Sequence, residues 1–300
     1  MRKYSKNQAL CFDDILLIPQ YSHIESRKSI DISMAGYQFP IVASPMDTVC
    51  EWKMALEISN EGGIGIIHRY MTPGKRITEF LMAMAHSKNS HNIGIAVSSA
   101  EAEDKEFMRS AIDAGCTWFC IDTANGHNFN AIKATRYLKS RYPKIKVMVG
   151  NVATVEGYIE LANAGADAVR VGIGGGATCK TRVVTGHGMP TLQSIIDCYE
   201  HKSSAGRSTL IVADGGIRNS GDIVKAFAAG ADLVMLGSML AGTEESPGEI
   251  LNGYKSFRGM ASEDAQMSWR GNVSVDEGVS TMIEYKGSVK DIFDQIKGGI

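Results

Sequence analysis

The 300-residue sequence has no long apolar run and no cluster of basic residues. No window approaches the roughly 18 uncharged apolar residues of a membrane-spanning helix, so we expect no contact with a membrane. The apolar stretch near the start is interrupted by Asp13 and Asp14, which argues against a signal peptide. The formal net charge is −2, and the lysines and arginines are dispersed, so binding to nucleic acid is also not expected.

The six cysteines lack the spacing of a disulfide framework or of a zinc site. Cys116 and Cys120 are four residues apart, and no pair of histidines lies at a ligand interval. We therefore expect reduced thiols in a cytoplasmic protein, most of them buried as small apolar side chains. Cys179 is the exception, because it lies in a loop that contains three consecutive glycines.

Short and nearly continuous apolar segments recur eight times along the chain. Strands that are buried on both faces of a parallel sheet have this pattern. Their alternation with helical patterns predicts one (β/α)8 barrel domain over residues 1–300. A doubly wound open sheet is the alternative, but no G-x-G-x-x-G motif follows the first segment. The expected strands are residues 40–44, 63–68, 92–97, 118–122, 146–151, 168–173, 210–214 and 233–238.

Helical patterns lie between most of these segments, and the interval between the second and third strands has room for a further helix and a loop. Residues 243–300 show no such alternation until about Val289. Within them, residues 262–280 are polar, and we expect them to form a mobile flap over the rim of the barrel. The expected helices are residues 52–61, 103–114, 130–141, 155–164, 191–200 and 220–229, the last with Ser220 as its N-cap.

Polar residues follow several of the expected strands. Active sites of (β/α)8 barrels lie at the carboxyl ends of the strands, so these residues should share one rim. The ends of the last two strands form the usual phosphate-binding corner, where Asp214 could also accept hydrogen bonds from ribose hydroxyls. The rim residues are Asp47, His68, Ser98, Asp122 with Asn125, Asn151, Asp214 with Gly215 and Gly216, and Gly237 with Ser238.

The loop over residues 172–182 carries the strongest chemical signal. Its glycines can adopt positive φ and approach a ligand closely, and its free N–H groups can hold an anion. Cys179 in such a loop is well placed to act as a nucleophile, although a tight turn with an incidental buried cysteine is the alternative. Thr181 could relay a proton to a leaving group, and Glu277 could orient or titrate Thr181. Each of these two could instead be an ordinary surface residue.

Short segments distributed along nearly the whole chain resemble the inosine monophosphate dehydrogenase and guanosine monophosphate reductase family. The loop cysteine of that family attacks C2 of a purine nucleotide, so the resemblance implies this role for Cys179. The matching segments are residues 12–17 (FDDILL), 43–49 (ASPMDTV), 62–68 (GGIGIIH), 150–154 (GNVAT), 171–174 (VGIG), 179–182 (CKTR), 185–190 (TGHGMP), 213–218 (ADGGIR), 237–249 and 258–260.

The resemblance also implies the ligands and their contacts. A potassium ion would lie on the carbonyls of Gly174, Gly176 and Cys179, and family members are commonly tetramers. Residues expected to bind the purine mononucleotide are Ser44, Met46, Asp214, Gly215, Gly216, Gly237, Ser238, Gly259 and Met260. Residues expected to bind the nicotinamide cofactor are Ser26, Arg27, Asp122, Thr123, Ala124 and Asn125.

The family contains two activities that share the covalent step. The dehydrogenase oxidises IMP with NAD and then hydrolyses the intermediate, using an Arg-Tyr pair in its flap to activate water. The reductase expels ammonia from GMP and reduces the same intermediate with NADPH to give IMP. A short flap without an Arg-Tyr pair, the absence of an inserted regulatory (CBS) domain, residues 122–126, Phe257 and the Ser26-Arg27 pair favour the reductase.

Other positions leave two alternatives open. Residues 43–47, Ser238 and residues 243–247 resemble bacterial dehydrogenases, so an IMP dehydrogenase without the regulatory domain is the first. Gly175 replaces the usual proline of the loop, Ala177 a serine that contacts phosphate, and Lys180 a threonine or similar residue. The sequence also ends before the family's tail. A barrel that binds purine nucleotides without catalysis is therefore the second.

Overall fold

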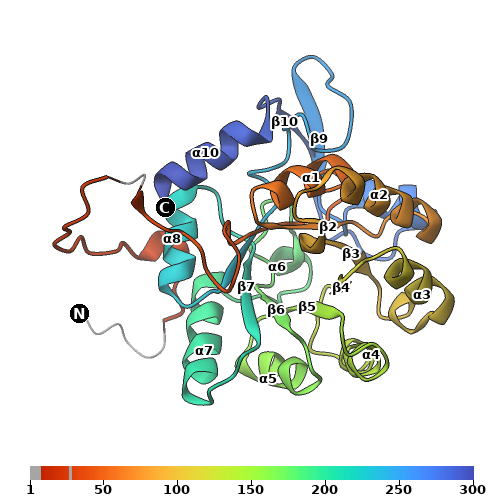
Figure 1. Ribbon diagram of the computed structural model, residues 1–300, viewed down its shortest axis with the longest axis horizontal. Helices are drawn as coiled ribbons and strands as arrows, with labels where there is room; N and C mark the ends of the chain where they lie inside the picture. The colour runs from red at the N-terminus through yellow and green to blue at the C-terminus, as the bar shows by residue number, and fades with distance from the viewer. Residues whose placement is uncertain (1–7, 27–28) are drawn as a thin grey trace.

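The computed structural model describes residues 8–26 and 29–300. Within them, eight parallel strands pair in chain order, and β8 (Leu233–Leu236) pairs with β1 (Ile41–Ala43) to close a barrel. Figure 1 shows the helices arranged around it. The predicted (β/α)8 architecture is confirmed. The remaining barrel strands are β2 (Ile64–Ile67), β3 (Ile93–Val97), β4 (Trp118–Asp122), β5 (Lys146–Val152), β6 (Ala168–Val171) and β7 (Leu210–Asp214).

Helices connect the strands on the outside of the barrel. All the predicted helices are present with ends that differ by a few residues, and a further long helix, α2, fills the interval between β2 and β3. Among the described residues, no helix combines the length and apolar character needed to span a membrane. The helices are α1 (Trp52–Asn60), α2 (Pro73–His86), α3 (Lys105–Asp113), α4 (Phe129–Arg141), α5 (Val155–Asn163), α6 (Thr181–Val184), α7 (Thr191–Ser204) and α8 (Ser220–Ala228), with 3₁₀ turns at Phe12–Asp14, Ser90–Asn92 and Glu101–Glu103.

The continuous apolar runs have a simple physical cause, because each barrel strand is covered on both faces. On β4, Trp118 and Cys120 belong to the cluster that fills the barrel interior, while Phe119 and Ile121 pack in the cluster under the helices. Successive side chains of a strand point to opposite faces, so both sets must be apolar. The barrel interior is thus a packed core, and a ligand can bind only at its ends.

One predicted N-cap is wrong, although the helix begins at Ser220 as predicted. We expected Ser220 to be the N-cap of α8, but Asn219 holds that position and its side chain accepts a hydrogen bond from the Asp222 backbone N–H at 2.9 Å. Asparagine and serine are about equally good N-caps, so the sequence offers two adjacent candidates and the backbone geometry decides between them.

The region after β8 is more regular than the sequence indicates. Strands β9 (Tyr254–Arg258) and β10 (Ser280–Glu284) form an antiparallel pair, and α9 (Glu263–Arg270) lies between them in the chain. Our expectation of no repeating structure before Val289 is therefore wrong. These strands are buried on one face at most, with Lys255 and Phe257 facing inward on β9, so they lack the continuous apolar run that marked the barrel strands.

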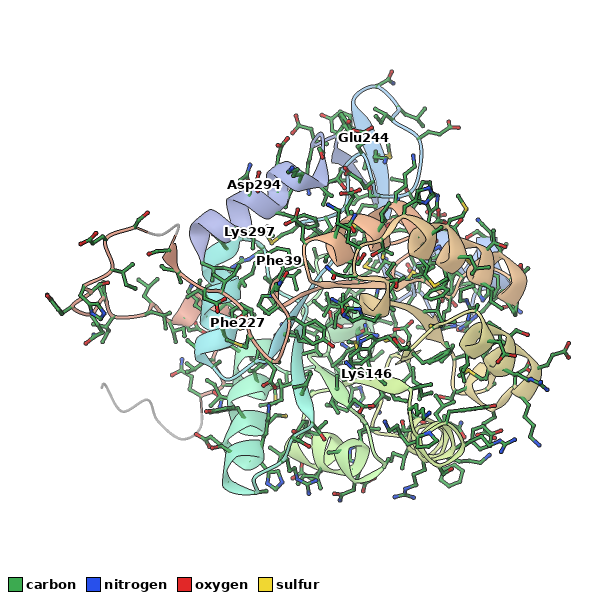
Figure 2. All side chains as sticks on the ribbon, in the orientation of Figure 1. Phe39, Lys146, Phe227, Glu244, Asp294 and Lys297 are labelled. Atoms are coloured by element: carbon green, nitrogen blue, oxygen red, sulfur yellow. The ribbon has the colours of Figure 1, made fainter. Side chains whose placement is uncertain are left out.

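The last helix, α10 (Val289–Gly299), packs on the segment that leads into β1. Its Phe293 ring meets Phe39 edge-on with centroids 5.3 Å apart, and the Lys297 ammonium lies 5.4 Å from the same ring. Figure 2 shows Phe39 and Lys297 side by side under this helix. These contacts fix the start of β1 and leave the opposite end of the barrel open for a site.

We predict that Gly65→Ala destabilises the protein, because β2 and α1 pack there without room for a side chain. A Cβ atom at Gly65 would lie 2.5 Å from Ala55 Cα. Overpacking of this kind lowers the free energy of unfolding by about 1–3 kcal/mol, which chemical denaturation would measure.

Gly74→Ala is the matched control. Nothing lies within 4 Å of a Cβ atom at Gly74, which is in the first turn of α2, so the change should be neutral or stabilise by up to about 1 kcal/mol. Equal stability of Gly65→Ala and the unchanged protein would contradict the close packing of α1 on β2.

Candidate active site

A cavity of about 600 Å³ opens at the carboxyl ends of the barrel strands. This size lies within the usual range for ligand-binding pockets. The lining residues come from the ends of β1 to β7 and from the flap. They include part of the predicted rim, whereas the lining lacks Asp47, His68, Asn125, Gly216, Gly237 and Ser238. The pocket therefore collects residues from widely separated parts of the sequence.

The glycines after β6 bring the loop close to the end of β7. Gly172 has φ of +140°, and a Cβ atom there would lie only 2.0 Å from the Asp214 carbonyl oxygen. Gly174, with φ of +80°, then turns the chain back toward the pocket. No other residue type fits at Gly172, because both its φ and the close contact exclude a side chain.

This loop presents the Cys179 thiol to a chain of two further polar groups. The Cys179 Sγ donates a hydrogen bond to Thr181 Oγ1 at 3.1 Å, and that hydroxyl donates to Glu277 Oε2 at 2.8 Å. The Thr181 backbone N–H also points at the sulfur, at 3.4 Å. All three residues line the pocket, so a thiol, a hydroxyl and a carboxylate form one connected route for a proton.

The other thiols have a different environment. Cys50, Cys116, Cys120 and Cys198 are buried, and burial raises the pKa of the last three to about 12. They stay protonated and act as small apolar side chains, as predicted. Among the described residues that line the pocket, Cys179 is the one cysteine.

The predicted flap, residues 262–280, covers the pocket from the side of β9 and β10. It contributes Gln266, Arg270, Ser274, Val275 and Glu277 to the lining, and it contains the helix α9. Its mobility stays a prediction.

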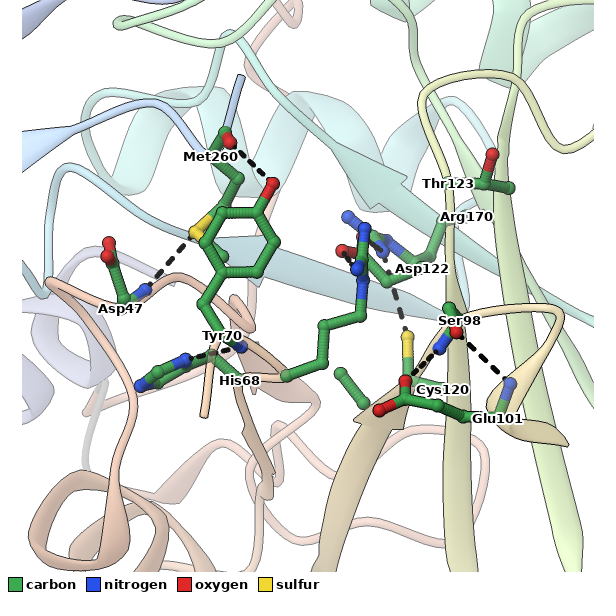
Figure 3. Close-up of polar contacts among 12 residues, drawn as sticks. Asp47, His68, Tyr70, Ser98, Glu101, Cys120, Asp122, Thr123, Arg170 and Met260 are labelled. Carbon is green, nitrogen blue, oxygen red and sulfur yellow. Dashed lines mark hydrogen bonds and ion pairs between the residues drawn. The ribbon is translucent and has the colours of Figure 1, made fainter. Parts of the chain in front are cut away.

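Two side chains of the barrel rim contact α9 and the segment that precedes it. The Tyr70 ring stacks on Trp269 with centroids 5.8 Å apart, and its hydroxyl donates to the Met260 carbonyl at 2.8 Å. Asp47 accepts from the Arg258 Nε at 3.0 Å. Figure 3 shows Tyr70 and Asp47 reaching Met260 from opposite sides. The flap is thus attached to the barrel through β1 and β2.

A charged floor, made of Arg69, Asp122, Asn151, Arg170 and Asp214, closes the pocket toward the barrel interior. The Arg170 guanidinium donates to Asp122 Oδ1 at 2.7 Å and to Asp214 Oδ2 at 3.0 Å (Figure 3 shows the contact with Asp122). Arg69 donates to the second oxygen of Asp122 at 3.3 Å, and Asn151 donates to Asp214 at 2.7 Å. Every member is paired, so the floor is rigid.

The electrostatics of the floor follow from these contacts. Burial would raise the pKa of Asp122, but the guanidinium groups of Arg170 and Arg69 outweigh it and hold that pKa below its usual range. Burial would also lower the pKa of Arg170, and Asp214 and Asp122 instead raise it. Asp122 and Arg170 are therefore both ionised at neutral pH.

Most of the residues predicted to bind nucleotide lie in the pocket. A Cβ atom at Gly237 would be 3.3 Å from the Met46 sulfur, so Gly237 adjoins the lining, whereas Gly216 and Ser238 do not line it. The Ser238 carbonyl accepts from the Lys286 ammonium at 2.6 Å. The predicted residues in the lining are Ser44, Met46, Asp214, Gly215, Gly259 and Met260.

Only some of the residues predicted to bind the cofactor line the pocket. Asp122, Thr123 and Ala124 line the pocket, but Asn125 does not, and its side chain accepts from the His127 backbone N–H at 3.0 Å. Ser26 lies on an exposed loop and is absent from the lining. Arg27 lies outside the described residues.

The loop carbonyls predicted to bind potassium belong to residues that line the pocket. Gly174, Gly176 and Cys179 lie within one turn of chain, and the Gly176 carbonyl accepts from the Cys179 N–H at 3.1 Å. In the part of the chain that the structure describes, His, Cys, Asp and Glu side chains form no group of three or more that could hold a metal ion.

Arg69, Tyr70 and Arg170 were missed by the sequence analysis. Arg69 and Tyr70 directly follow His68, so extending the rim by two residues would have included them. Arg170 is a charged residue inside the apolar run of β6, which is itself a signal for a paired charge in the barrel.

Comparison with known proteins agrees with this geometry. A family model described as the IMP dehydrogenase / GMP reductase domain matches residues 9–300. The chain is 36% identical over 351 residues to inosine-5'-monophosphate dehydrogenase of Cryptosporidium parvum, a match that covers 98% of this chain and 86% of that protein. It is 35% identical over 361 residues to the same-named protein of Borreliella burgdorferi, covering 98% and 88%.

A GMP reductase is equally similar. The chain is 34% identical over 308 residues to GMP reductase of Vibrio atlanticus, covering 97% of this chain and 88% of that protein. The identities thus do not separate the two activities. The barrel, the thiol loop at its rim and these matches together show that the chain belongs to the IMP dehydrogenase / GMP reductase family of oxidoreductases.

Proposed function

We propose that this protein converts GMP to IMP and ammonia in a reaction that consumes NADPH. The observation that supports this best is the carboxylate of Glu277, which the flap brings to the Cys179 thiol through the Thr181 hydroxyl. A leaving amine needs a proton, and this route ends on a group that can supply one. The flap also lacks adjacent arginine and tyrosine, which the resemblance associates with hydrolysis.

In this proposal the Cys179 sulfur adds to C2 of the guanine, and its proton moves along Thr181 to Glu277. The same route returns a proton to the amino group, which leaves as ammonia and gives a thioimidate on Cys179. When bound, NADPH supplies the hydride that reduces C2. The C2–sulfur bond then breaks and releases IMP, and the Cys179 thiolate takes up a proton from solvent to restore the thiol.

The nucleotide would lie between the two glycine segments. Gly215 and Gly216 have φ of +95° and +81°, and a Cβ atom at Gly215 would be 3.1 Å from the Gly176 N. Backbone N–H groups at such a position can hold a phosphate. Asp214 would accept from the ribose, and Met46 and Met260 would contact the base. Gly237 and Ser238 would complete the phosphate site.

The cofactor would occupy the part of the pocket beyond Cys179. There the hydroxyls of Ser98, Ser99 and Thr123 and the aromatic ring of Tyr70 line the cavity. Hydroxyls and a flat ring fit the ribose and the ring of a nicotinamide nucleotide. Asp122 already accepts a hydrogen bond from Arg69. It would therefore hold Arg69 in place beside the cofactor rather than bind the cofactor by itself.

A potassium ion would have a different role. Carbonyl oxygens suit this ion, and those of Gly174, Gly176 and Cys179 lie close together in the chain. Held there, the ion would stiffen the loop that presents the thiol.

A homotetramer is the assembly that we propose. Residues 15–26 and 29–34 expose large apolar side chains, including Leu16 and Tyr21, which are 84% and 93% exposed. Exposed apolar groups in such number indicate contact with another protein surface. Ser26 lies on the same segment, so its predicted cofactor contact would be made at a neighbouring copy's pocket. The six free cysteines support a cytoplasmic location.

IMP dehydrogenase is the second candidate, and one observation favours it. Arg270 of the flap and Tyr70 of the rim both line the pocket. They could supply from separate segments the arginine and tyrosine that activate water in the dehydrogenase.

The two activities can be separated by mixing the protein with each nucleotide and cofactor. We expect absorbance at about 340 nm, the band of reduced nicotinamide, to fall with GMP and NADPH. No change with GMP, together with a rise on adding IMP and NAD, would replace the reductase by the dehydrogenase.

Mass spectrometry after acid quenching should find nucleotide attached to Cys179, with GMP supplied alone and with NADP. Cys179→Ala should abolish the adduct and change the free energy of unfolding by no more than about 0.5 kcal/mol, because the thiol faces a pocket. Cys11→Ala is the control and should retain the adduct. Tight nucleotide binding with neither adduct nor turnover would instead identify a binding protein.

Glu277→Gln and Thr181→Val should each lower the rate of the chemical step by about 10²- to 10⁴-fold, because each interrupts the proton route. Single-turnover kinetics would measure the effect. Glu263→Gln is a matched change at an exposed position of the same flap and should leave the rate near that of the unchanged protein. A normal rate in Glu277→Gln would remove this carboxylate from the mechanism.

A further inference from the structure

The loop that carries Cys179 and the end of the flap form a short antiparallel pairing. Cys179 and Gly278 form a bridge, the Lys180 N–H donates to the Glu277 carbonyl at 2.7 Å, and the Val279 N–H donates to the Thr178 carbonyl at 2.8 Å. The backbone beside the nucleophile is therefore bonded to the backbone that carries the carboxylate. This pairing fixes where the Glu277 side chain begins.

Asp276 connects three segments at the end of this pairing. Its Oδ2 accepts from the Lys180 ammonium at 2.7 Å. Its Oδ1 accepts from the backbone N–H of Glu263, at 3.2 Å, and of Gly278, at 3.3 Å. One carboxylate thus holds the thiol loop, the start of α9 and the residue after Glu277.

Lys180 gives this junction its charge balance. Asp276 and Glu277 are adjacent carboxylates, and the Lys180 ammonium is the cation that bonds to the first of them. The hydrogen bond from Lys180 holds the pKa of Asp276 below its usual range, so this carboxylate is ionised at neutral pH. About a third of each side chain is exposed, so the pair should contribute little to overall stability.

We propose that Lys180 and Asp276 are positioning residues, whose ion pair holds the flap so that the Glu277 carboxylate reaches the Thr181 hydroxyl. Neither side chain touches the thiol route itself, which runs from Cys179 through Thr181 to Glu277. The role of the pair in turnover rests on the function proposed above. The effect of the ion pair on the thiol does not depend on that proposed function, and it can be measured without a substrate.

The first test measures turnover in Lys180→Met, Asp276→Asn and the double variant. Asparagine keeps an oxygen for the Glu263 and Gly278 N–H groups, so it removes mainly the ion pair. A misplaced catalytic group costs up to about 100-fold, and we expect kcat to fall about tenfold with KM nearly unchanged. The double variant should be no slower than the slower single one, and Lys180→Arg should restore most of the rate.

The control for this test is Lys133→Met, which removes the ion pair with Glu103 and should leave kcat unchanged, because neither residue lines the pocket. Normal turnover in Lys180→Met, or additive losses in the double variant, would overturn the proposal.

The second test measures the rate at which iodoacetamide alkylates Cys179, with Cys11 as the internal reference. Lys180→Met removes a positive charge and Asp276→Asn a negative one, so a direct electrostatic effect on the thiol would change the rate in opposite directions. Loss of positioning should change it in the same direction in both variants, and in that of Glu277→Gln. Opposite changes, or none, would overturn the proposal.

An unchanged protein that is inactive with every nucleotide and cofactor would refute the proposed function, while the alkylation rates would still decide the role of the pair.

Discussion

The site depends on one buried guanidinium, that of Arg170. It lies in the barrel between the carboxylate of Asp214 on the neighbouring strand β7 and that of Asp122 on β4, two strands away from its own. A charge at this depth is tolerated only while it is paired, and an unpaired one would cost several kcal/mol. The ends of β4, β6 and β7 are consequently held in one arrangement. Gly172 passes directly over Asp214. The position of the thiol loop therefore also depends on the ion pair between Arg170 and Asp214.

The barrel could be predicted from local pattern because its cause is local. A strand covered on both faces must be apolar throughout, and β4 and β7 were predicted with the bounds that the structure has. Strands β9 and β10 were not predicted, because half-exposed strands lack that continuous apolar pattern. The N-cap of α8 was misassigned by one residue, since Asn219 and Ser220 are equally suitable caps and only the backbone distinguishes them.

Some features of the site could likewise be predicted from local sequence and others could not. Glycines, a cysteine and strand-end polar residues mark the rim, and the family resemblance links Cys179 to a proton route. The hydrogen bond between Thr181 and Glu277 joins positions 96 residues apart, which no spacing rule could reveal. Arg69 and Asp122 are 53 residues apart, and Arg170 and Asp214 are 44 apart. Thr181 was paired with Glu277 in the sequence analysis, but the other two pairings become visible only when the barrel has brought the strand ends together.

The attachment of the flap couples the position of one segment to the reactivity of another. Flap residues line the pocket, and the carboxylate of the thiol route belongs to the flap. Any displacement of the flap would therefore separate Glu277 from Thr181 and interrupt the route to the Cys179 sulfur. The chemistry of a loop on β6 thus depends on a segment more than 80 residues further along the chain.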